Sequence, residues 1–191
     1  MNDDGWYRAV TQWAQQTRWL QEPALLFTEY GIVLLALASL WILWRVRYRD
    51  SVMIATALWI PLAMVLAPAA GLVIKSIVAE PRPCRSLVNV TTVLACDGPT
   101  DYSFPSNHSA ICAAFAVALF VLHRRWGLVA GIFAVLMAAS RVYVGAHYPH
   151  DVIVGLVVGG LVGALGYLVR RWLAPLVDRL RARVPRLGAA R

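Results

Sequence analysis

Ionisable side chains stand at the edges of apolar segments in the middle of this 191-residue sequence. They comprise two imidazoles, one carboxylate and three cations: His108, His147, Asp151, Lys75, Arg82 and Arg141. An ionisable group at the end of a membrane segment is costly unless it has a use. Arg binds phosphate oxygens two at a time, and Lys adds a point charge. Cations that converge on two histidines would supply the charge neutralisation, nucleophile and proton donor of phosphoryl transfer without a metal.

The spacing of these residues strengthens that interpretation. His147 and Asp151 are four residues apart, so on a helix the carboxylate can hold one ring nitrogen and leave the other free to attack. Pro149 favours a helix that begins between them. The segment 105–108 (Pro-Ser-Asn-His) precedes an apolar run, so the free N–H groups of a helix start would face the same site. Taken singly, each feature also fits a simpler role: a cation reaching lipid headgroups, or an ordinary helix cap.

The elements that must position these groups are membrane helices. The chain is 60% apolar and 15% charged, against about 45–50% and 25% in soluble domains, which excludes a small soluble globule and a disordered chain. A bilayer-spanning helix needs roughly 20 apolar residues. Five segments approach that length: Ala24–Trp44, Val52–Ile74, Pro105–Leu122, Trp126–Val144 and Val152–Val169. In the last of these, Gly155, Gly159 and Gly163 have the small-residue spacing that lets helices pack closely.

The first 22 residues have a different pattern. Trp6, Val10 and Trp13 recur at three- and four-residue intervals, with Arg and Gln between them, which is typical of an amphipathic helix in the membrane interface. We therefore predict an all-α, polytopic transmembrane helical bundle of five or six spans. Its parts are an interfacial helix (1–22), the transmembrane domain (23–173) and a basic tail (174–191).

Charge distribution predicts the orientation of the bundle. The net charge is +8, from 18 cations and 10 acids. Twelve of the arginines lie in the first and third connections and the C-terminal tail, beside only two acids. By the positive-inside rule these parts are cytoplasmic, which places the N-terminus and the predicted site outside the plasma membrane. The basic charge is then explained by membrane orientation and by contact with lipid headgroups, and no nucleic-acid partner is expected.

The cysteines fit an extracytoplasmic loop. Cys84 and Cys96 both lie in the connection Ala79–Phe104, whereas Cys112 falls inside a span. A disulfide persists in an oxidising compartment, so we expect Cys84 and Cys96 to be bridged, with two free thiols as the alternative.

Three motifs give the sequence a family resemblance. Residues 75–83 match the KxxxxxxRP element of the type 2 phosphatidic acid phosphatase (PAP2) family, residues 105–108 resemble its PSGH element, and residues 140–151 fit SRxxxxxHxxxD. The motifs occur in the family's order. Two departures are visible: Asn107 stands where the family has Gly, and five spans with an interfacial helix stand where six spans are usual. Gly allows unusual backbone angles, and Asn is the next most tolerant residue.

The resemblance implies a role for each matching residue. His147 would be the nucleophile that forms a phosphohistidine, Asp151 would orient it, and His108 would protonate the leaving oxygen and then activate water. The phosphoryl oxygens would be held by the following residues: Lys75, Arg82, Ser106, Asn107 and Arg141. It implies no metal ligands and no cofactor.

The position of the motifs at headgroup level indicates a lipid phosphate as substrate. The resemblance is strongest to the branch that hydrolyses undecaprenyl diphosphate, a polyprenyl diphosphate. The alternatives are a glycerolipid phosphatase (acting on phosphatidylglycerophosphate or phosphatidic acid), a lipid phosphotransferase, and a non-catalytic lipid-binding membrane protein. Glu29 either reaches the interface or faces the site, His123 and His150 are expected at headgroup level, and the oligomeric state stays open.

Overall fold

The computed structural model describes residues 3–183, and this part of the chain is helical and contains no strand. In chain order its helices are α1 (Asp3–Gln16), α2 (Arg18–Val46), α3 (Ser51–Val78), α4 (Pro83–Ser86), α5 (Asn107–Leu122), α6 (Arg124–Tyr143), α7 (Pro149–Ala164) and α8 (Gly166–Arg183). The all-α prediction is thus confirmed for the described residues.

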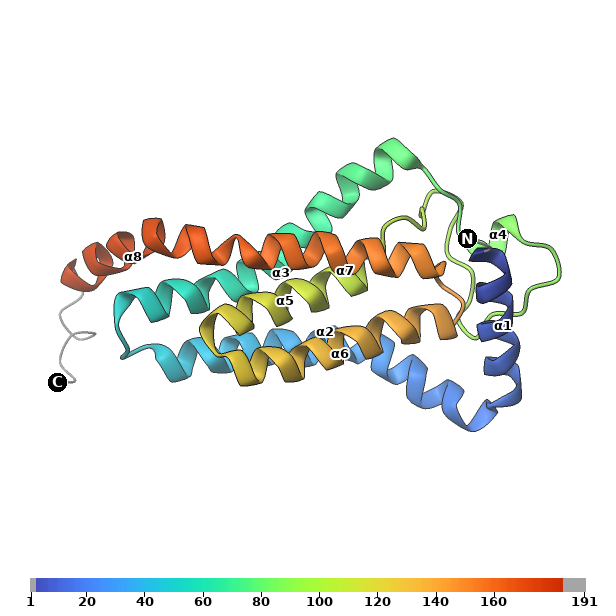
Figure 1. Ribbon diagram of the computed structural model, residues 1–191, viewed down its shortest axis with the longest axis horizontal. Helices are drawn as coiled ribbons and strands as arrows, with labels where there is room; N and C mark the ends of the chain where they lie inside the picture. Colours follow the sequence, from blue (N-terminus) through green and yellow to red (C-terminus); the bar gives the residue numbers. More distant parts are fainter. Residues whose placement is uncertain (1–2, 184–191) are drawn as a thin grey trace.

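The long helices run side by side along the molecule (Figure 1). Helix α1 lies across one end of this bundle, near α4 and the loop that precedes α5, and the last turn of α8 lies at the opposite end. Helix α5 is central, because it packs against α3, α6 and α7 and buries small and aromatic residues such as Ala110, Ala114 and Phe115.

Four stretches are long and apolar enough to cross a membrane: Arg18–Val46, Ser51–Ser86, Arg124–Tyr143 and Pro149–Arg183. Apolar side chains cover their outer surfaces, including Leu34, Val65 and Ile132, each more than half exposed. Helix α5 is apolar but has only 16 residues, or about 24 Å at 1.5 Å per residue. The protein is therefore a membrane protein whose central helix α5 is shorter than the four stretches that are long enough to cross a membrane.

The glycines of α7 allow it to lie directly on α5, as their spacing predicts. A Cβ atom at Gly159 would lie 2.0 Å from the carbonyl oxygen of Ala110, and one at Gly155 would lie 2.5 Å from that of Ser106. The Ser106 N–H donates to the carbonyl oxygen of Asp151 at 3.0 Å. This close packing joins the start of α5 to the first turn of α7, which brings two of the three motifs together.

Helix α1 differs from the prediction in extent and in its buried face. The helix is interrupted at Thr17, so residues 18–22 belong to α2 and not to the first helix. Tyr7 is fully buried, and its hydroxyl donates to the carbonyl oxygen of Gly145 at 2.8 Å. Trp6 and Trp13 remain exposed. The Trp pattern identified the outward face of the helix, whereas Tyr7 docks it on the loop between α6 and α7.

The starts of α3, α5, α6 and α7 fall within three residues of those expected, whereas the predicted span Val152–Val169 is divided at Leu165 between α7 and α8. Helix α5 begins at Asn107 with Ser106 as its N-cap, and α7 begins at Pro149. The predicted disulfide between Cys84 and Cys96 is present, and Cys112 is free and buried in α5. Helix α8 extends to Arg183, so the first part of the predicted basic tail is helical, and residues 184–191 lie outside the described residues.

Candidate active site

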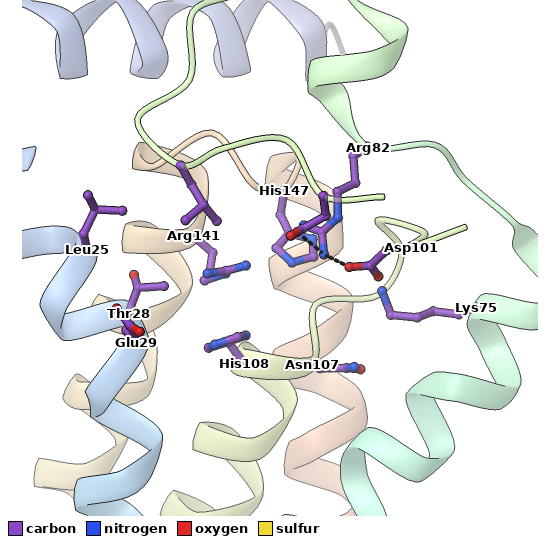
Figure 2. A pocket seen from close by; sticks show the side chains of 12 residues that line it. Leu25, Thr28, Glu29, Lys75, Arg82, Asp101, Asn107, His108, Arg141 and His147 are labelled. Carbon is purple, nitrogen blue, oxygen red and sulfur yellow. Dashed lines mark hydrogen bonds and ion pairs between the residues drawn. The ribbon is translucent and has the colours of Figure 1, made fainter. Parts of the chain in front are cut away.

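A cavity of about 460 Å³ lies at the end of the bundle that α1 covers. Six of the eight predicted site residues line it, and Figure 2 shows their side chains pointing into one space from α3, α5, α6 and the loops. These six are Lys75, Arg82, Asn107, His108, Arg141 and His147. Residues more than 70 positions apart in the sequence therefore meet around a single cavity.

His147 is held by Asp151 behind it. The Nδ1 atom of His147 lies 3.3 Å from Oδ2 of Asp151, which leaves Nε2 as the ring nitrogen available to the cavity. Both side chains are buried. Burial lowers the pKa of His147 to about 4, with the nearby Arg141 and Arg82 acting in the same direction and the Asp151 hydrogen bond opposing them. The imidazole is therefore neutral and able to act as a nucleophile at neutral pH.

The same oxygen of Asp151 is fixed by two further donors. The Tyr148 N–H donates to Oδ2 at 2.8 Å, and the Ser103 hydroxyl also donates to it. Three donors on one oxygen hold the carboxylate in a single orientation, and this orientation in turn fixes the imidazole ring.

Arg82 and Arg141 present unused donors inside the protein. Each side chain is about 95% buried, yet within the described part of the chain the Nε atom of each has no hydrogen-bond partner. Arg82 uses its other nitrogens: Nη1 donates to Ala146 O at 2.9 Å, and Nη2 lies 2.8 Å from Asp101 and 3.1 Å from Asp97. Buried donors normally have partners, so the two guanidinium groups indicate an anion-binding cavity.

Lys75 enters from the last turn of α3. Its Nζ atom donates to the backbone carbonyls of Tyr102 and Ser103. The side chain is 7% exposed. It therefore anchors the loop before α5 while adding a positive charge to the cavity.

The start of α5 contributes His108 and Asn107 to the cavity. Asn107 Oδ1 is buried without a partner. The backbone of Asn107 is helical and does not have a positive φ, so the tolerance of Asn for left-handed angles is not needed here. Ser106 is fully buried and does not line the cavity; its hydroxyl accepts hydrogen bonds from the Ser109 N–H at 3.5 Å and hydroxyl at 3.1 Å. The structure thus shows Ser106 as the cap that orients this helix start.

Several residues of the site were not identified from the sequence. Asp97 and Asp101 lie in the loop before α5 and form ion pairs with Arg82. The one sequence feature that pointed to Asp97 was its position directly after Cys96, which forms the disulfide. Ser103 precedes the second motif and holds Asp151. Glu29 faces the site rather than only the interface, since it lines the cavity together with Thr28.

One group of side chains outside the cavity lining could hold a cation. Glu80, His150 and Asp151 each offer a ligand atom, and these atoms lie within 4.8 Å of one another. From the sequence, His150 was expected at headgroup level and no metal ligands were expected, because Glu80 is about 70 residues away from His150 and Asp151 in the chain.

Comparisons with known proteins agree with the motifs. The sequence profile of the PAP2 superfamily matches residues 56–175. The chain is 42% identical to the undecaprenyl-diphosphatase of Sulfolobus acidocaldarius over 105 residues, which are 54% of this chain and half of that relative. It is 32% identical to the undecaprenyl-diphosphatase BcrC of Bacillus subtilis over 178 residues, 90% of this chain and 86% of the relative.

A solved structure has the same fold. The transmembrane PAP2-type phosphatidylglycerolphosphate phosphatase of Bacillus subtilis superposes with a TM-score of 0.60 at 23% identity, covering 94% of this chain and 86% of that one. At this identity the likeness concerns the fold. Because the superfamily profile covers more than half of the chain and includes all three motifs, the chain belongs to the PAP2 superfamily, with the fold of a transmembrane phosphatase.

Proposed function

We propose that this membrane protein is a lipid phosphatase that hydrolyses a polyprenyl diphosphate, with undecaprenyl diphosphate as the substrate. The observation that carries the proposal is the pair of buried guanidinium groups with unpartnered Nε atoms, Arg82 and Arg141, beside two imidazoles in one cavity. A phosphoryl group would satisfy these donors and come within reach of His147.

In the first step, Nε2 of His147 attacks the terminal phosphorus, and the bond from phosphorus to the bridging oxygen breaks. His108 gives a proton to the leaving oxygen, and a phosphohistidine remains. The carboxylate of Asp151 stabilises the positive charge that develops on the ring. Arg82, Arg141 and Lys75 stabilise the phosphoryl oxygens, so no step in this mechanism requires a metal.

In the second step, His108 takes a proton from water as the water attacks the phosphohistidine. The bond between phosphorus and Nε2 breaks, inorganic phosphate leaves, and His147 is restored. The acids Asp97 and Asp101 hold Arg82 when no phosphate is bound. The incoming phosphate competes with them for the Nη2 donor.

Two relatives support the choice of lipid. The proteins of Sulfolobus acidocaldarius and Bacillus subtilis described above are both named undecaprenyl-diphosphatases. The alternative is a glycerolipid phosphatase, because one solved structure that shares the fold is named a phosphatidylglycerolphosphate phosphatase.

We also propose five spans, with α5 as the shortest, in the plasma membrane. Helix α1 would lie in the outer interface, where its exposed Trp6 and Trp13 match headgroup depth. The arginines near the C-terminus would be cytoplasmic, as would the tail from residue 174. Because α5 is about 6 Å shorter than a hydrocarbon core of about 30 Å, the cavity at its start would be recessed below the outer membrane surface.

The test is phosphate release by the purified protein in EDTA. Undecaprenyl diphosphate, phosphatidylglycerolphosphate and phosphatidic acid are supplied in mixed micelles, and kcat/KM is measured for each. We expect the diphosphate to be preferred and His147→Ala to be inactive, with His123→Ala at the other end of the bundle as the matched control. Preference for a glycerolipid would overturn the choice of substrate, and full activity of His147→Ala would overturn the mechanism.

A further inference from the structure

A second polar cluster lies behind Asp151, on the side away from His147. It joins α1, the end of α3 and the first turn of α7 through Asp3, Glu80, His150 and Asp151. Nε2 of His150 lies 3.0 Å from Oε2 of Glu80 and 3.1 Å from Oδ1 of Asp151. Three potential ligand atoms from three residues therefore surround one point.

The two oxygens of Asp151 have different environments. Oδ2 contacts His147, Ser103 and the Tyr148 N–H. Oδ1 is buried in a side chain that is 0% exposed, and among residues 3–183 it has no hydrogen-bond partner. Its contact with His150 lacks hydrogen-bond geometry. A buried carboxylate oxygen without a donor is costly, so Oδ1 is an acceptor that a bound cation would satisfy.

The ring of His150 is fixed in an orientation that suits metal binding. Its Nδ1 atom contacts a carboxylate oxygen of Asp3, and the ring stacks on Tyr148 and lies near Phe104, with centroid distances of 5.5 and 5.6 Å. If Nδ1 carries the proton that Asp3 accepts, Nε2 presents a lone pair to the cluster. A single hydrogen on Nε2 could serve either Glu80 or Asp151 but not both, whereas a cation would serve both oxygens and the nitrogen.

We propose that Glu80, His150 and Asp151 bind one divalent transition-metal ion such as Zn²⁺. An imidazole and two carboxylates suit zinc, whose bonds of about 2.0–2.2 Å place tetrahedral ligands roughly 3.3 Å apart. The observed spacings of 3.0 and 3.1 Å need only a small expansion. Asp3 would be the outer carboxylate that orients a metal-bound histidine. Glu80 and His150 are partly exposed, so the ion can enter from solvent.

This site shares Asp151 with the proposed hydrolysis but uses the other oxygen of that carboxylate. The ion would use Oδ1 of Asp151, while Oδ2 continues to hold His147. Its effect would be to tie α1 and the end of α3 to α7. The proposed mechanism works in EDTA, so failure of the metal site would leave that mechanism intact.

The experiment measures zinc binding to the full chain in detergent, purified without a polyhistidine tag. Isothermal titration with Zn²⁺ is expected to give one site per chain, and Mg²⁺ is expected to bind far more weakly because one ligand is an imidazole. His150→Ala should abolish binding. Asp3→Asn should weaken it about 10- to 100-fold, as loss of an outer carboxylate does, whereas Asp4→Asn, its exposed neighbour, should not.

Thermal unfolding in EDTA establishes that each variant is folded, and Zn²⁺ should raise the midpoint of the wild type but not of His150→Ala. His147→Ala, inactive under the proposed function, should still bind zinc. The proposal is overturned if the folded wild type binds no zinc, or if zinc binds the wild type, His150→Ala and Asp3→Asn with equal affinity.

Discussion

Replacing Arg141 with lysine tests whether the cavity uses the fork of a guanidinium or only its charge. Arg141 is 5% exposed, and its Nε atom is buried with no partner. Lysine keeps the positive charge but loses the planar pair of donors that matches two phosphate oxygens. A loss of activity in Arg141→Lys would therefore reflect lost hydrogen-bond geometry, since the net charge of the site is unchanged.

The expected loss follows from the number of donors removed. Loss of one preorganised donor to a developing oxyanion costs about 2–4 kcal/mol of transition-state stabilisation. At about 1.4 kcal/mol per factor of ten, kcat should fall roughly 30- to 1000-fold. Binding of the whole lipid should change less, because the polyprenyl tail is unaffected.

The assay compares kcat for phosphate release from undecaprenyl diphosphate in mixed micelles containing EDTA. Arg125→Lys is the matched control, because this exposed arginine lies at the opposite end of the same helix, α6. Thermal unfolding checks that both variants are folded. A kcat within threefold of wild type for folded Arg141→Lys would refute forked binding, and an equal fall in Arg125→Lys would show that the effect is not local.

The remaining predictions concern the nucleophile, helix packing and the disulfide. Burial lowers the pKa of His147 to about 4 from 6.5, so the imidazole stays neutral in mild acid. The kcat in EDTA should therefore hold down to about pH 5. A fall in kcat on the acid side centred near pH 6.5 would contradict this. In Gly155→Ala, the added Cβ would lie 2.5 Å from Ser106 O, and the resulting shift of α7 relative to α5 should lower kcat by up to about a hundredfold. Gly131→Ala, whose added Cβ has nothing described within 4 Å, should match wild type. Equal kcat values for the two variants would contradict the role of close packing. Cys84→Ser should lower the free energy of unfolding by about 3 kcal/mol, as expected for a loop of a dozen or so residues; an unchanged unfolding midpoint would contradict it.

The parts of the site that sequence predicts well are local. Pro149 and the segment 105–108 mark helix starts through short-range rules of capping and backbone angle, and the structure begins α7 and α5 there. The four-residue spacing of His147 and Asp151 likewise predicts their contact, although His147 lies two residues before α7 and the carboxylate reaches back to it across the helix start. The glycine spacing of α7 predicts its close packing, although the partner helix follows only from the fold.

The parts that sequence did not predict depend on long-range contacts. The pairing of Asp97 and Asp101 with Arg82 joins the loop before α5 to the start of α4, and no periodic pattern encodes it. The docking of α1 through Tyr7 was missed because the Trp pattern describes only the exposed face. Ser106 was assigned to phosphate from its motif, yet in the folded chain its hydroxyl contacts Ser109 within α5.

The proposed mechanism requires His147 to carry the phosphoryl group during turnover, and this covalent species can be trapped. Wild-type protein is mixed with undecaprenyl diphosphate labelled at its terminal phosphate, quenched in base to preserve phosphohistidine, digested and analysed by mass spectrometry. We predict label on His147 in the wild type and none in His147→Ala. Rapid phosphate release with no label on His147, or with label on another side chain, would contradict the account.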